Sequence, residues 1–243
     1  MKTLATWIAK GGVGKSTLTG NLSYYLKGRG KVLLVDADPQ GNLSGWLHPE
    51  TFNYELADVL NGQVEIKDAI ISVREGLDLL GTFAIGGNLK RWSETVLPSR
   101  PFAFHDLKDA AVTLGYDYLV FDCSPGLSIL ERSIIGVTDQ VLPIVRPEYF
   151  SFDGIEVFKE SIETVRKELR SKVSAPYLIV NGLNLSFGVH KSYYEALKDF
   201  EYELYTIGQT TKATEAQTAH KFLAEYDPEN KILAEYKRLS EAV

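Results

Sequence analysis

This chain of 243 residues has few cysteines and histidines and no excess of basic residues. The single cysteine, Cys123, excludes internal disulfides and any metal cluster that one chain would hold through several cysteines. The four histidines are scattered without metal-ligand spacing, so we expect no histidine metal site. The 26 lysines and arginines are outnumbered by 32 acidic residues, which argues against a uniformly basic nucleic-acid binder. Any DNA contact would have to come from a local patch of cations.

Long apolar runs are also missing. No segment approaches the ~20 apolar residues that a helix needs to cross a bilayer. Met1 leads directly into the first expected strand, which predicts no signal peptide and a cytoplasmic protein without stable membrane insertion. The length suits one large α/β domain over residues 1–243, and no linker divides it.

The most informative stretch that is present runs from Leu4 to Thr17. An apolar, β-prone run enters a glycine cluster and leaves through Lys15-Ser16-Thr17 into a segment with helical spacing, which is typical of a phosphate-binding loop. Glycines let backbone N–H groups converge on an anion, and the helix N-terminus adds the positive end of its dipole. In such a loop Lys15 reaches the terminal phosphates and the Ser16 hydroxyl holds Mg²⁺.

One position departs from the usual pattern, because Ala9 stands where the first glycine is expected and Lys10 follows it. The loop by itself does not decide between two interpretations of Lys10, an ordinary surface lysine and a functional residue. A dinucleotide-binding fingerprint is the rival interpretation of the glycines. This interpretation fails because Lys15 follows Gly14, and the third small residue that the fingerprint needs at the helix–strand contact is missing.

Carboxylates follow two further apolar runs. Lys31–Asp36 has the near-continuous hydrophobicity of a central parallel strand, and Asp36 and Asp38 emerge at its carboxyl end, where open α/β sheets bind ligands. The run 116–122 ends in Asp122 before a Ser-Pro-Gly turn, which is the form of a Walker B element whose carboxylate supports Mg²⁺. An aspartate that only caps the next helix is the alternative for Asp122.

The remaining pattern alternates strands with helices. This alternation predicts a doubly wound, mostly parallel α/β sheet with helices on both faces, the architecture of P-loop NTPases. Further strands are expected at 77–81, 140–145, 177–181 and 202–206, and helices at 16–26, 56–62, 105–114, 155–169, 211–225 and 229–242.

With these elements placed, the chain resembles the ParA/MinD family of deviant Walker A ATPases, most of all the ParA-type partition ATPases. The resemblance rests on residues 10–17, on Asp36-Ala37-Asp38-Pro39-Gln40-Gly41-Asn42 and on Phe121-Asp122-Cys123-Ser124-Pro125. It continues through Arg146-Pro147-Glu148 and spans nearly the whole chain.

The resemblance implies a role for each matching residue. Lys10 matches the signature lysine that crosses an ATP-sandwich homodimer to the partner's nucleotide, as an arginine finger does. Asp38 matches the carboxylate that orients the attacking water, and Lys10, Lys15 and Asp38 are the implied catalytic residues. The implied ATP-binding residues are Gly11, Gly12, Val13, Gly14, Lys15, Ser16, Thr17 and, at the adenine edge, Asn181. The implied Mg²⁺ residues are Ser16, Asp36 and Asp122.

Two departures bear on this transfer. Cys123-Ser124 stand where a Thr-Pro-like pair is common, and Gly208 stands where the family often has a proline beside the base. The chain also starts directly at the phosphate loop, so we expect no N-terminal helix-turn-helix extension and no sequence-specific operator binding.

The function implied is an ATPase that dimerises on ATP, binds non-specific DNA on the nucleoid, and hydrolyses ATP under a ParB-like partner or a cargo adaptor. It would segregate plasmid or chromosome DNA, or position a protein cargo. The alternative is a MinD-like ATPase that cycles on a membrane, which needs a C-terminal amphipathic helix with a basic face. The stripe of Ile232, Leu233, Tyr236 and Leu239 is amphipathic, but acidic residues offset its neighbouring cations. A nucleotide-binding adaptor without turnover is a further alternative, and it is disfavoured by the presence of Lys15, Asp38 and Asp122.

Overall fold

The computed structural model describes residues 1–148 and 151–243. Its strands form a six-stranded sheet in the order β3-β4-β2-β5-β1-β6 and a three-stranded sheet in the order β7-β8-β9. Every described pair is parallel except the pair of β3 with β4. The strands are β1 (Lys2–Thr6), β2 (Val32–Ala37), β3 (Ile70–Arg74), β4 (Leu77–Leu80), β5 (Tyr118–Cys123), β6 (Gln140–Leu142), β7 (Ile144–Val145), β8 (Tyr177–Leu183) and β9 (Glu203–Gly208).

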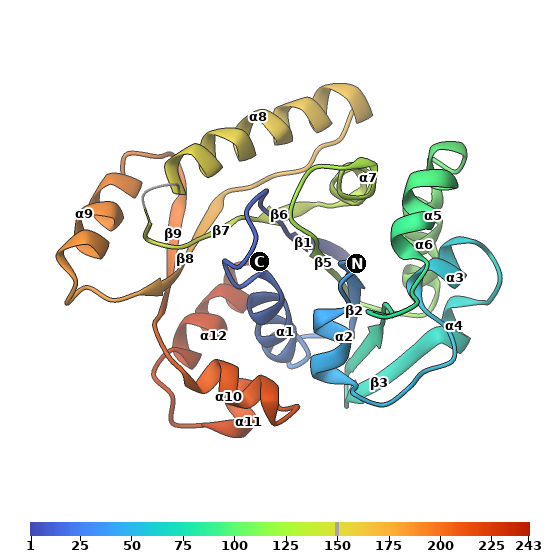
Figure 1. Cartoon of the computed structure of the whole chain (residues 1–243), viewed down its shortest axis with the longest axis horizontal. Coiled ribbons are helices and arrows are strands. Elements are labelled where there is room, and N and C mark those ends of the chain that lie inside the picture. The colour runs from blue at the N-terminus through green and yellow to red at the C-terminus, as the bar shows by residue number, and fades with distance from the viewer. Residues whose placement is uncertain (149–150) are drawn as a thin grey trace.

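Helices cover both faces of the sheet, with α1 and α12 on one side and α7 and α8 on the other (Figure 1). The prediction of a doubly wound, mostly parallel α/β sheet is therefore confirmed. The helices are α1 (Lys15–Leu26), α2 (Asn42–Leu47), α3 (Leu56–Leu60), α4 (Ile66–Ala69), α5 (Leu89–Thr95), the 3₁₀ turn η1 (Leu97–Ser99), α6 (Ala103–Thr113), α7 (Ile129–Val137), α8 (Ser151–Leu169), α9 (Gly188–Leu197), α10 (Lys212–Thr218), α11 (Leu223–Tyr226) and α12 (Leu233–Ala242).

The central strands β1, β2 and β5 bring the sequence motifs together. All of β2 is buried, as expected for a strand covered on both faces. Within the sheet, Asp122 of β5 lies in register with Thr6 of β1 on one side and with Asp36 of β2 on the other. The carboxyl ends of these three strands therefore place the phosphate loop beside both aspartate segments.

Two of the predicted elements are divided in the structure. The expected strand over 140–145 is divided by Pro143, because proline has no N–H to donate to a ladder, and the chain passes there from one sheet into the other. The expected helix over 211–225 is two short helices, α10 and α11, separated at His220, which has a φ of 53°. Such a backbone angle cannot continue a right-handed helix.

The C-terminal amphipathic stripe lies inside the fold. Leu233, Tyr236 and Leu239 of α12 are buried, and the helix packs against α1 and β9. These apolar side chains are therefore not presented to a membrane surface. Within residues 1–148 and 151–243, no helix combines the length and hydropathy that crossing a bilayer requires.

Candidate functional site

The phosphate loop connects β1 to α1 and ends at Gly14, which caps the helix. Gly14 has a φ of 101°, an angle that side-chain-bearing residues rarely adopt. A Cβ on Gly14 would also overlap the amide group of Asn181. Gly12 has a φ of 72° as well, but the space around it is open. Glycine is thus required at position 14 for two reasons, the positive φ of the backbone and the close approach of the Asn181 side chain.

This double requirement predicts that Gly14→Ala is more damaging to the fold than Gly12→Ala. Gly12→Ala adds only backbone strain of ~1–2 kcal/mol. Gly14→Ala adds overpacking against Asn181, which brings the expected loss of unfolding free energy to about 3 kcal/mol. Denaturant unfolding without nucleotide measures both. The double variant Gly14→Ala/Asn181→Ala should recover the overpacking part, and equal losses in the two single variants would contradict the account.

Lys15 lies under the loop, with its side chain almost fully buried. Its Nζ donates a hydrogen bond of 2.9 Å to the carbonyl of Lys10, which holds the loop closed around it. Burial lowers the pKa of Lys15, and the nearby carboxylates of Asp122 and Asp38 raise it in part. Among the residues that the structure describes, the ammonium group has no direct ion pair, so it can exchange its carbonyl contact for phosphate oxygens.

Asp36 is fully buried and organises the loop that carries Asp38. Its Oδ2 accepts hydrogen bonds from the backbone N–H and the hydroxyl of Ser44, at 2.8 and 2.7 Å, and its Oδ1 accepts one from the Asp38 N–H at 3.2 Å. The Ser44 hydroxyl in turn accepts a bond from the Thr82 N–H. Burial, followed by the charge of Asp122, raises the pKa of Asp36 to about 8. Protein groups thus occupy both oxygens of Asp36.

Asp122 is equally buried but less completely bonded. The hydroxyls of Ser16 and Thr19 bond to its carboxylate, with Thr19 Oγ1 at 3.1 Å from Oδ1. Its Oδ2 is buried but has no hydrogen-bond partner within residues 1–148 and 151–243. Burial raises the pKa of Asp122 to about 7, against the lowering effect of these hydroxyl bonds. A buried, unpartnered carboxylate oxygen is costly unless a ligand engages it.

These observations fit a magnesium site between Ser16 and Asp122. Mg²⁺ prefers oxygen ligands and is usually held by one or two protein groups together with phosphates and waters. Among the described residues, no group of three or more histidines, cysteines or carboxylates could cage a metal. The ion would neutralise charge on the phosphates, while Ser16, Thr19 and Lys15 of this chain orient the groups around it.

The sequence did not single out Thr19, Ser44 or Thr82. Thr19 could have been found, because it lies four residues after Lys15 and therefore on the same face of α1. Ser44 and Thr82 carry no comparable signal, because their contact with Asp36 depends on how α2 and the end of β4 pack.

Comparison with known proteins agrees with this geometry. A family model described as an AAA domain matches residues 1–175. The chain is 30% identical to the sporulation initiation inhibitor protein Soj of Bacillus subtilis, over 100% of this chain and 98% of that protein. It is also 34% identical to an uncharacterised protein of Borreliella burgdorferi, over 100% and 99%. The chain belongs to the ParA/MinD family of P-loop ATPases.

Solved structures of similar proteins have the same architecture. A plasmid partition protein of Borrelia burgdorferi bound to AMPPNP superposes with a TM-score of 0.83 at 25% identity, covering 99% of this chain and 97% of that one. The ATP complex of Cyanothece McdA gives a TM-score of 0.85 at 22% identity, over 100% and 97%, and shows the fold alone. Membership of this family of P-loop ATPases, together with the AMPPNP bound to the Borrelia burgdorferi partition protein, confirms ATP as the predicted nucleotide.

Asn181 lies at the carboxyl end of β8, where its Nδ2 donates a 2.7 Å hydrogen bond to the carbonyl of Val13. It therefore braces the phosphate loop, and its predicted role at the adenine edge stays a prediction. A hollow of about 470 Å³ opens beyond it at the ends of β8 and β9, lined by Leu183, Asn184, Leu185, Thr206, Gly208 and Gln209. Gly208 lines this hollow, and a Cβ on it would lie 3.1 Å from the Ile232 side chain.

Lys10 is directed differently from Lys15. Its Nζ forms an ion pair of 3.0 Å with Glu148, and the two side chains are 32% and 49% exposed. Lys10 therefore lies on the surface beside the loop, while Lys15 lies beneath it. A lysine in this position can leave a surface ion pair at little cost, because such pairs contribute only ~0–1 kcal/mol.

Proposed function

We propose that this protein is a ParA-type ATPase that dimerises when it binds ATP, coats DNA non-specifically, and releases it when a partner protein stimulates hydrolysis. The observation that carries the proposal is the separate placement of the two loop lysines. Lys15 serves the phosphates of its own subunit, whereas the Lys10 side chain stands outside and pairs with Glu148 at the surface. A second subunit facing this edge would receive Lys10 at its own nucleotide.

The relatives support this proposal at the level of biological role. Besides Soj, the chain is 33% identical to the chromosome partitioning protein ParA of Caulobacter vibrioides, over 71% of this chain. We propose that the cycle segregates a plasmid or chromosome, or positions a protein cargo, from the nucleoid in the cytoplasm. The likeness to McdA concerns the fold and does not choose between DNA and protein cargo.

Single-domain organisation remains part of the proposal. Residues 1–243 would act as one ATPase unit, with Asp38 aligning the attacking water and Asp122 and Ser16 supporting Mg²⁺. We do not propose the membrane-cycling alternative, because the apolar side chains of α12 that would insert are packed against α1 and β9.

The proposal predicts ATP-dependent binding to duplex DNA of random sequence. Among the described residues, the exposed lysines Lys167, Lys172 and Lys191 have no ion-pair partner and are candidates for phosphate contacts. Fluorescence anisotropy with Mg²⁺ and ATP should show binding that weakens steeply as salt rises.

Each lysine that contacts a phosphate should lower the salt slope by about 0.9 when it is replaced by alanine. Lys67→Ala on α4, at the opposite edge of the sheet, is the matched control and should leave the slope unchanged. An ATP-bound protein that ignores DNA at low salt would remove DNA binding from the proposal.

A further inference from the structure

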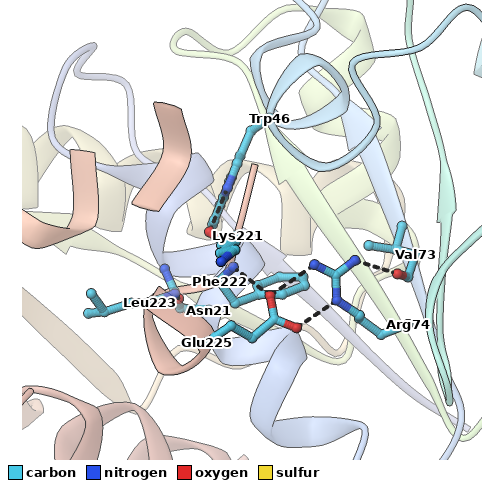
Figure 2. A network of polar contacts seen from close by, with 8 residues as sticks. All are labelled: Asn21, Trp46, Val73, Arg74, Lys221, Phe222, Leu223 and Glu225. Atoms are coloured by element: carbon cyan, nitrogen blue, oxygen red, sulfur yellow. Dashed lines mark hydrogen bonds and ion pairs between the residues drawn. The ribbon is translucent and has the colours of Figure 1, made fainter. Parts of the chain in front are cut away.

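Trp46, near the end of α2, contacts residues 220–222, which are far from it in the sequence. Its indole N–H donates a 3.0 Å hydrogen bond to the carbonyl of Lys221 (Figure 2). The backbone carbonyl of Trp46 lies 3.0 Å from Nδ1 of His220. Because a carbonyl only accepts, Nδ1 of His220 carries the proton. The indole ring also packs on Phe222, with ring centroids 5.7 Å apart, and on Gly20, where a Cβ would overlap it. We call Trp46 with residues 220–222 the Trp46 clamp.

The clamp is fixed to the helix that follows the phosphate loop. Leu223 N–H donates to Asn21 Oδ1 at 2.9 Å (Figure 2), and Gln217 Nε2 donates to Thr17 Oγ1 at 2.9 Å. Thr17 and Asn21 are four residues apart and lie on one face of α1. The segment that grips Trp46 is therefore held in register with the phosphate loop itself.

A second anchor holds the same segment to the edge of the sheet. Arg74 donates to both carboxylate oxygens of Glu225, at 2.6 and 2.9 Å, and its guanidinium lies 5.4 Å from the centre of the Phe222 ring (Figure 2). The Glu225 carboxylate also accepts a bond from the N–H of Phe222. Residues 217–225 thus form a frame that connects α1, α2 and β3.

The helix that carries Trp46, α2, follows directly after the loop that contains Asp38. The Asp38 carbonyl accepts a 2.9 Å bond from the N–H of Gly41, and α2 begins at the next residue. At six residues, α2 is too short to hold its position alone, so contacts with the rest of the fold decide it. Ser44 attaches its inner side to Asp36, and Trp46 attaches its outer end to the frame.

His220 adopts a strained backbone to make this contact. Its φ of 53° lies in the left-handed region, where a helix usually ends on glycine or asparagine. Arg170, with a φ of 51°, is the other described residue of this kind that is not glycine. Strain of this kind persists where the side chain contributes something that glycine cannot. Here the side chain contributes the ring that contacts the Trp46 carbonyl.

We propose that Trp46 and His220 are positioning residues for ATP hydrolysis. The clamp fixes the position of the Asp38 loop relative to α1. It thereby sets the position of Asp38 relative to phosphates held at the N-terminus of that helix. The inference rests on the proposed role of Asp38 in aligning water. Neither residue belongs to the phosphate loop, so the clamp should affect hydrolysis and leave ATP binding alone.

Two variants test the clamp in phosphate-release assays at saturating ATP and Mg²⁺, without DNA. Trp46→Phe keeps an aromatic ring and removes the N–H, and His220→Gly removes the ring while relieving the backbone. Each should lower kcat at least about tenfold, because small misplacements of catalytic groups are costly. The dissociation constant for ATP should stay within about twofold, and the Tm of His220→Gly within about 4 °C of wild type.

Arg170→Gly is the matched control, since it relieves the same backbone angle at the end of α8. Its kcat should equal that of wild type. Hydrogen exchange over residues 38–47 should be faster in His220→Gly than in Arg170→Gly. The double variant Trp46→Phe/His220→Gly should lose little more activity than either single variant, because the two hydrogen bonds that they remove hold the same end of α2.

The results separate this inference from the proposed function. A wild-type protein that releases no phosphate contradicts the function on which the clamp depends. Wild-type kcat in both clamp variants overturns the clamp and leaves the function standing. Parallel losses of kcat, ATP affinity and Tm would mean that the contact only stabilises the fold, and would also overturn the positioning role.

Discussion

Lys15→Ala should abolish ATP binding, with an affinity at least ~100-fold lower than that of wild type. The Lys15 ammonium is buried beneath the loop, and its bond to the Lys10 carbonyl places it where the phosphates enter. Removing it leaves the phosphates facing Asp38 and Asp122 without a compensating positive charge. Isothermal titration with ATP and Mg²⁺ measures the loss.

Lys27→Ala is the control for this prediction, because Lys27 follows the C-terminal end of the same helix. It should bind ATP as wild type does. Retention of near-wild-type affinity by Lys15→Ala would contradict the assignment of the phosphate loop itself, since no other described lysine is buried in that position.

Lys10→Ala should give the opposite pattern. ATP affinity should remain within a few-fold of wild type, because Lys10 is bonded to Glu148 on the surface rather than to the loop interior. Hydrolysis should fall by about 10³-fold, the scale on which a positive charge supplied in trans stabilises phosphoryl transfer. Phosphate release and ATP titration on the same preparation measure the two effects.

Dimerisation provides an independent readout of Lys10. In sedimentation velocity with ATP and Mg²⁺, Lys10→Ala should show a weakened dimer, since the lysine would contact the partner's nucleotide. Equal ATPase rates for Lys10→Ala and wild type would refute the assignment.

The sequence predicted the parts of the site that local chemistry determines. The glycines, Lys15 and Ser16 must follow one another for a loop to surround phosphate, and strand hydrophobicity located Asp36 and Asp122. The sheet then placed these two aspartates in register. Their roles in catalysis and metal binding stay predictions.

Contacts between distant segments could not be predicted in this way. The bond between Trp46 and Lys221 joins residues 175 positions apart, and no periodicity signals it. The left-handed backbone of His220 was equally hidden, because helical patterning continues on both sides of it. The edge strand β3 was not predicted, and it is only half-buried, whereas its neighbour β4 is mostly buried.

The account depends most on the claim that each nucleotide site is completed by the other subunit. Mixing Lys10→Ala with Asp38→Ala tests it directly. In a mixed dimer, the Lys10→Ala subunit keeps its own Asp38 and receives Lys10 from its partner, while the other site lacks both. Half of randomly paired dimers are mixed, and each contains one complete site, so the mixture should recover up to about a quarter of the wild-type rate. A mixture as inactive as its separate components would contradict the shared site.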